Sequence, residues 1–210
     1  MLLISGYCNA SNGQAYLNGE PCLDSPVKNL ESLIEALIQK YKVTHPRFGK
    51  MDRLSQLGFT IADMILQNTH LADTHDPFKL GMVLSNSSSS LDTDIKYWES
   101  TSGIPSPALF VYTLPNIVLA EISIKNKFKG ENYFFISEKP DFNLLHTYIT
   151  EMFISKRLEA CLGGWVEVLE NNFDAFLFLV EEKQHANMLE FTEENITTIY
   201  KKHNNGTVND

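Results

Sequence analysis

Side chains that could do chemistry are scattered along this 210-residue chain. The sequence has no Gly-x-Ser-x-Gly segment, no glycine-rich phosphate loop and no His-Glu-x-x-His segment. His70 and His75 lie five residues apart in a polar loop, and a solvated surface is favoured because metal ligation usually needs a geometrically convergent set of ligands. The serines at residues 87–90 could offer a nucleophile, but no base is identified near them, so a loop is favoured. The sequence therefore indicates neither a metal site nor a cofactor.

The cysteines Cys8, Cys22 and Cys161 are odd in number and include no Cys-x-x-Cys pair. Neither a disulfide framework nor a zinc site is therefore expected. A cytoplasmic location fits these thiols, because the first residues lack the basic and apolar stretches of a secretory signal. No apolar run approaches the ~20 residues that a membrane-spanning helix needs.

The composition is that of a globular protein with a sizeable core. Hydrophobic residues make up 43% of the chain and charged residues 20%, which excludes the composition of a disordered segment. Acidic residues outnumber basic ones by 26 to 17, which gives a formal charge of -9. This excess argues against a nucleic-acid or anionic-membrane partner, since both need clustered cations.

Hydrophobic periodicity predicts an α/β fold. Apolar spacings of three and four predict helices over residues 27–41, 50–68, 91–99, 115–128 and 141–156. Short apolar runs predict strands over residues 2–6, 80–84, 133–137, 160–169 and 175–181. Residues 7–26 and most of 85–107 are predicted as loops. We expect a mostly parallel five-stranded sheet with helices packed on it, in one domain over residues 1–190, and a frayed polar tail over 191–210.

One segment resembles a known family closely. Residues 113–132, TLPNIVLAEISIKNKFKGEN, are similar to the pattern t-L-P-N-x-x-x-x-x-I-a-I-x-x-x-x-K-G-P-N of the β-ketoacyl synthases, the condensing enzymes of fatty-acid and polyketide synthesis. Glu131 stands where that pattern has proline. Further similar segments are ISGYCNAS at residues 4–11, the stretch 47–64, LGGWVE at 162–167 and the stretch 174–186. The resemblance covers roughly residues 1–187.

The resemblance implies half of a thiolase-like fold without its nucleophile. The family places its reactive cysteine seven residues after the asparagine that matches Asn132, and this chain has Lys139 there. A protonated amine does not replace a thiolate in thioester exchange. Cys161 belongs to a later strand, so it is not a displaced nucleophile. The family's second half, with two histidines and a lysine, is expected to be missing, and no catalytic residue is assigned.

The resemblance also implies a protein partner. Ketosynthases pair through the strand before the nucleophile, and some pathways use a chain-length factor, a sister subunit that lacks the cysteine. We therefore expect this chain to be inactive and to pair with a full-length β-ketoacyl synthase, while acyl carrier protein docks on that enzyme. The interface and tunnel candidates are Phe110, Tyr112, Thr113, Leu114, Asn116, Tyr133, Phe134, Phe135, Ile136 and Ser137.

Two alternatives stay open at the level of sequence. The first is a homodimer that binds an acyl chain or another lipid in the family's tunnel. The second is an enzyme with different chemistry that uses Ser87, His146 or Lys139.

Overall fold

The first part of the chain forms three strands in a meander. In the computed structural model, which describes residues 1–182 and 188–204, β1 (Leu2–Ser11), β2 (Gln14–Leu17) and β3 (Glu20–Pro21) pair in antiparallel fashion. Both turns are Asn-Gly pairs at positive φ: Asn12 (51°) with Gly13 (75°), and Asn18 (53°) with Gly19 (88°). Such pairs suit the two-residue turns of hairpins. The prediction of a loop over residues 7–26 is therefore wrong for most of that stretch.

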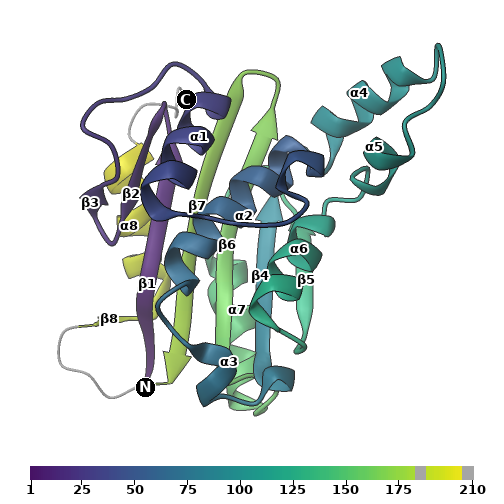
Figure 1. Ribbon diagram of the computed structural model, residues 1–210. Coiled ribbons are helices and arrows are strands. Elements are labelled where there is room, and N and C mark those ends of the chain that lie inside the picture. Colours follow the sequence, from purple (N-terminus) through teal and green to yellow (C-terminus); the bar gives the residue numbers. More distant parts are fainter. Residues whose placement is uncertain (183–187, 205–210) are drawn as a thin grey trace.

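All described strands join one mixed sheet (Figure 1). Its further strands are β4 (Leu80–Asn86), β5 (Asn132–Ile136), β6 (Ala160–Leu169), β7 (Asn172–Glu182) and β8 (Leu189–Glu190). The order is β3-β2-β1-β7-β6-β4-β5, and β8 pairs with β1. In the described part of the chain, β4 pairs in parallel with β5 and β6, and the other pairs are antiparallel.

The α/β architecture is confirmed, but the expectation of a mostly parallel five-stranded sheet is wrong. The hairpins account for part of the difference, and β1 and β7, which lie far apart in the sequence, also pair in antiparallel fashion. Leu169 pairs with Asn172, so two residues connect β6 to β7, and a parallel connection needs a much longer crossover. The parallel pairs arise where helices lie between the strands, as between β4 and β5.

Helices cover both faces of the sheet (Figure 1). α1 (Leu30–Tyr41), α2 (Arg53–Leu66) and α6 (Ile117–Asn126) lie on one face, with the short helix α3 (Leu71–Thr74) at its lower end. α7 (Phe142–Ile154) and α8 (Glu193–Asn204) lie on the other. Asn29, Asp52 and Asp141 cap α1, α2 and α7 by accepting hydrogen bonds from backbone N–H groups. None of the helices in residues 1–182 and 188–204 is long and apolar enough to cross a bilayer.

Side chains of β7 point alternately to the two faces of the sheet, and each face has its own hydrophobic cluster. Leu177 and Leu179 belong to the cluster under α1 and α2, whereas Phe176, Phe178 and Val180 pack beneath α7 and α8. Successive side chains of a strand point to opposite faces, so a strand that is apolar at every position is buried on both. The sheet is thus the shared centre of two hydrophobic layers.

The C-terminal segment is part of this core. We expected residues 191–210 to be frayed, but α8 covers 193–204, and Phe191, Ile196 and Ile199 are buried against the α7 side of the sheet. The spacing of Ile196 and Ile199 gives the helix one apolar face, which the many polar residues around it obscure in the sequence. Residues 205–210 and 183–186, the end of one family-like segment, lie outside the described residues.

The long segment between β4 and β5 leaves the body of the molecule. α4 (Leu91–Ser100) and α5 (Pro107–Val111) form an arm, residues 91–114, that projects beyond the sheet (Figure 1). The sequence predicts α4 correctly but treats α5 as loop. α5 is a single short turn of helix with Ser106 as its N-cap and Pro107 at its first position.

The packing of α8 predicts a clear stability effect. Replacing Ile196, which is fully buried, with alanine should lower the free energy of unfolding by about 2–5 kcal/mol, because it leaves a cavity in the second cluster. The matched variant Thr198→Ala, on the exposed side of α8, should change it by less than about 0.5 kcal/mol. Urea denaturation followed by circular dichroism measures both. Equal stability of the two variants would show that α8 does not pack as described.

Candidate functional site

The outermost strand β5 is an open edge of the sheet. It pairs with β4 and stands last in the strand order of the described residues. Ile136 at its end is exposed, and the three residues before it are partly buried. An open edge with apolar side chains is a template for pairing with another strand.

The side chains of β5 are ordered by contacts within the chain. Tyr133 and Phe135 lie on the α7 side, where both rings pack edge-on against Tyr148. The Tyr133 hydroxyl donates a 2.7 Å hydrogen bond to Oε2 of Glu131, and this carboxylate also holds Arg157. Phe134 packs into the cluster on the opposite face. The edge strand is therefore fixed in shape before any partner binds.

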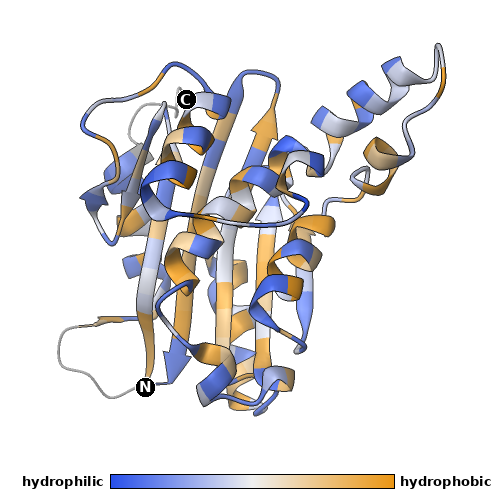
Figure 2. Ribbon diagram, viewed as in Figure 1, coloured by the Kyte–Doolittle hydropathy of each residue, from blue (hydrophilic) through white to orange (hydrophobic). Residues whose placement is uncertain are grey.

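The arm beside β5 carries large apolar side chains in water. Trp98 is 76% exposed, Ile104 94% and Phe110 60%, and the set continues with Leu91, Ile95, Val111 and Leu114. Figure 2 shows the apolar character of α5 on this arm. Exposed apolar side chains gathered on one part of a surface are typical of protein interfaces. Together, β5 and the arm form the candidate partner-binding face.

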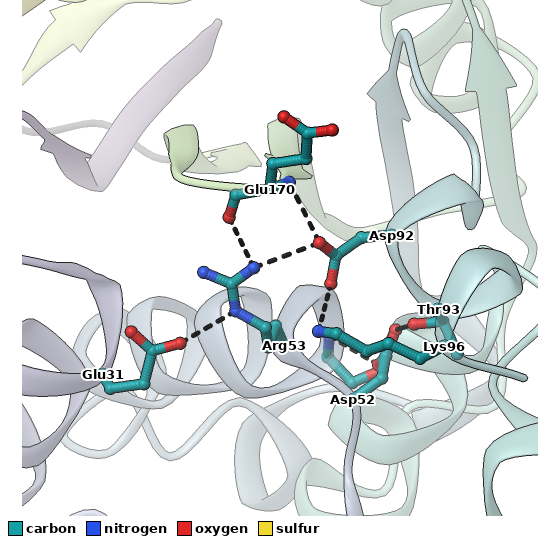
Figure 3. A network of polar contacts seen from close by, with 8 residues as sticks. Glu31, Asp52, Arg53, Asp92, Thr93, Lys96 and Glu170 are labelled. Carbon is teal, nitrogen blue, oxygen red and sulfur yellow. Dashed lines mark hydrogen bonds and ion pairs between the residues drawn. The ribbon is translucent and has the colours of Figure 1, made fainter. Parts of the chain in front are cut away.

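A buried polar network holds the start of the arm (Figure 3). Asp92, which is 6% exposed, accepts hydrogen bonds at Oδ1 from Arg53 (3.1 Å) and from the backbone N–H of Glu170 (3.0 Å). Its Oδ2 accepts a 2.7 Å bond from Lys96. Arg53 also donates to the carbonyl of Glu170. One carboxylate thus ties α4 to α2 and to the turn between β6 and β7.

A second carboxylate lies under the same helix. Asp52 caps α2 and accepts a 2.7 Å bond from the hydroxyl of Thr93. Burial raises the pKa of Asp52 above its ordinary range, although the hydrogen bonds from Ser55 and Thr93 oppose the shift. A raised pKa in the folded state means that this group's contribution to stability falls as the pH rises through that pKa.

A third contact holds the other end of the arm. The Tyr112 hydroxyl donates a 2.9 Å hydrogen bond to Glu121 of α6, and both side chains are buried. Burial and this carboxylate raise the pKa of Tyr112. His45 and Arg47 lie 3.5 Å from the same carboxylate. Ser90 donates to the carbonyl of Thr113, so the two ends of the arm are also tied to each other.

The tunnel and interface candidates from the sequence lie in different environments. Phe110 and Leu114 are exposed, and Thr113 bonds the carbonyl of Phe110. Tyr112 is a core residue, and Asn116 precedes α6 without a side-chain cap bond. Among the candidates on the arm, Phe110 and Leu114 are therefore the ones whose side chains a partner could reach. Their tunnel role stays a prediction.

Lys139 lies in the loop between β5 and α7, two residues before the cap Asp141. Its side chain is exposed, and its carbonyl accepts a 3.0 Å hydrogen bond from Ser137. The loop forms one wall of a cleft of about 1380 Å³. The opposite walls come from α8, from the β6–β7 hairpin and from the turn at residues 12–13. The residue that the sequence resemblance assigns to the nucleophile position is thus an amine that borders a large cleft.

The other proposed nucleophile and base are not assembled with Lys139. Ser87 donates a 2.6 Å hydrogen bond to Glu167, while His146 of α7 packs against Phe191. Neither Ser87 nor His146 lines the cleft that contains Lys139. Among the described residues, no three His, Cys, Asp or Glu side chains are grouped as a metal site.

Comparison with models of protein families and with curated protein sequences gives no match. Comparison with solved structures gives several matches. The ishigamide ketosynthase/chain length factor matches with a TM-score of 0.65 at 16% identity, over 89% of this chain and 63% of that one. A β-ketoacyl synthase from Burkholderia phymatum matches with a TM-score of 0.57 at 12% identity, over 88% of this chain and 60% of that one.

The chain has a ketosynthase-like fold. It spans less than two thirds of the length of both structures above. A chain of a ketosynthase in complex with its chain length factor, from Xenorhabdus doucetiae, also matches, with a TM-score of 0.56 at 10% identity. That match covers 96% of this chain and 90% of the other, so the two ketosynthase-like chains are of similar length. The thiolase-like architecture implied by the sequence is confirmed at the level of fold.

The contacts that fix the arm predict the effect of removing Asp92. Asp92→Ala leaves Arg53 and the Glu170 N–H without their acceptor, so it should lower the free energy of unfolding by about 3 kcal/mol. It should also make residues 91–114 cleave faster in limited proteolysis. The control is Glu99→Ala, at an exposed position of the same helix. It should leave the free energy of unfolding and the cleavage rate unchanged. A wild-type cleavage rate for Asp92→Ala would contradict the role given to the network.

Proposed function

We propose that this chain is a chain-length-factor-like subunit without ketosynthase activity, which pairs with a full-length β-ketoacyl synthase in bacterial polyketide, aryl-polyene or fatty-acid type biosynthesis. The observation that carries the proposal is the apolar face formed by β5 and the arm on a ketosynthase-like fold. Two of the similar structures support it, because each is of a ketosynthase together with a chain length factor.

Pairing would use the edge of β5 and the side chains of the arm. The backbone groups on the open side of β5 add hydrogen bonds to a strand of the partner. Trp98, Ile104 and Phe110 lose their contact with water at the same time, which supplies the hydrophobic part of the association. The arm is already held by Asp92 and Glu121, so little conformational entropy is lost on binding.

The partner would carry out the chemistry. Condensation needs a thiolate to hold the acyl chain and donors to stabilise the developing oxyanion. Lys139 supplies neither, and Cys161 is fully buried in β6 with its pKa raised by that burial. In the pair, Phe110 and Leu114 would reach toward the partner and restrict the space left for a growing chain.

Pairing is tested by substitutions on the proposed face. Phe110→Asp or Ile136→Asp should weaken association with a full-length β-ketoacyl synthase by about 30-fold or more, since each places a charge in an apolar contact. Leu189→Asp makes the same change on β8, which lies away from β5 in the strand order, and should not weaken it. Co-purification and titration calorimetry measure the effect. A symmetric homodimer with co-purified lipid would instead favour the alternative of an acyl-binding module.

Inactivity is tested on the separate subunits. The purified chain should give no condensation product from malonyl and acyl thioesters and no covalent acyl adduct by intact mass. The pair with the ketosynthase should form product, and replacing the nucleophilic cysteine of that partner with alanine should abolish it. Product from this chain alone would disprove the proposal.

A further inference from the structure

Two polar side chains on β6 lie at the cleft with unpartnered atoms. Trp165 and Glu167 are two residues apart on one strand, so their side chains point to the same face, and both line the cleft. Trp165 is only 3% exposed, yet its Nε1 has no hydrogen-bond partner in the described part of the chain. Oε2 of Glu167 accepts bonds from Ser87 and Ser88, whereas Oε1 is buried without one.

These two atoms are a donor and an acceptor. Indole Nε1 can only donate, and a carboxylate oxygen can only accept. Leaving such groups buried and unpaired is costly, so each one in a native structure needs an explanation. A single hydroxyl group satisfies both, because its oxygen accepts from Nε1 and its proton is donated to Oε1.

The other residues of the cleft suit a ligand in which this hydroxyl group is attached to an aromatic ring. Its walls include Phe142, Phe173 and Tyr200, and the Phe142 ring packs edge-on against Tyr200. Its volume of about 1380 Å³ exceeds the ~300–1,000 Å³ typical of small-molecule pockets. A ligand of one or two rings therefore fits together with solvent, and its faces and edges can pack on the aromatic walls.

The charges of the cleft select against an anion. The acidic lining residues are Glu138, Asp141, Glu167, Asp174 and Glu193, and the basic ones are Lys28, Lys139 and Lys201, so the acids exceed the bases by two. Asp141 accepts from the backbone N–H of Leu144 and Glu193 from Asn143, so these carboxylates are held in place. A neutral ligand avoids the repulsion that a second carboxylate would meet here.

We propose that this cleft binds an uncharged aromatic alcohol of the phenol type, whose hydroxyl group accepts from Nε1 of Trp165 and donates to Oε1 of Glu167. The cleft lies between the β6–β7 hairpin, α8 and the loop of Lys139, and none of its lining residues comes from the arm, whose exposed side chains carry the proposed pairing.

Matched probes test the site on the full chain. Calorimetric titration should give 4-ethylphenol an affinity at least ~5-fold higher than that of ethylbenzene, which lacks the hydroxyl group, and higher than that of the anion 4-hydroxybenzoate. Trp165→Phe keeps an aromatic ring but removes the donor, so it should weaken 4-ethylphenol binding by about 2–10-fold and leave ethylbenzene binding unchanged. The control is Trp98→Phe, the same change on the arm, which should alter neither the affinity for 4-ethylphenol nor that for ethylbenzene.

A spectroscopic signature does not depend on the folding of Trp165→Phe. The chain has two tryptophans, so the one indole N–H resonance kept in Trp98→Phe belongs to Trp165. It should move downfield when 4-ethylphenol is added and stay in place with ethylbenzene. Equal affinities for the two probes, no binding of either, or a shift produced only by the purified ketosynthase would overturn the proposal, and the last result would identify a protein segment as the occupant.

Discussion

The buried carboxylate of Asp92 is the constraint on which the candidate partner-binding face depends. It accepts hydrogen bonds from α2, from the β6–β7 turn and from its own helix at once. Without these bonds, an arm rich in exposed apolar residues has few contacts with the body of the molecule. A charge buried this deeply is stable only when every oxygen is paired, so the network selects one direction for α4 rather than adding much net stability.

The core could be predicted from the sequence because its pattern is local. The periodicity of α1, α2 and α7 and the apolar runs of β4 and β6 each identify an element within about two residues of its observed bounds at most ends. The two Asn-Gly pairs indicate the hairpin turns on either side of β2, although the loop predicted over residues 7–26 does not include these hairpins. Strand direction was mispredicted because the β6–β7 turn, with Glu170 at φ 52° and no glycine, carries no such signal.

The candidate site was predicted only in part, for a physical reason. The position of Lys139 and the edge strand follow from a continuous stretch of sequence, so they could be assigned before the structure. The hydrogen bonds from Arg53 to Asp92, from Tyr112 to Glu121 and from Ser87 to Glu167 join residues that are far apart in the sequence or separated by a turn. No periodicity encodes such contacts, and in the sequence these residues look like ordinary surface polar groups.

The two surfaces inferred for this chain meet at one loop. Glu167 at the cleft bonds the backbone of Ser87 and Ser88, and the next residues of that loop lead directly into the arm through Ser90 and Asp92. A ligand that takes up Oε1 of Glu167 leaves its Oε2 bonded to the loop, so it can bind without releasing the arm. Reorienting that carboxylate would instead release Ser87 and loosen the segment that positions α4. Coupling between the cleft and the candidate partner-binding face therefore depends on the orientation of a single side chain. It would appear as ligand affinity that changes when the proposed partner binds, and by reciprocity as pairing that changes with ligand.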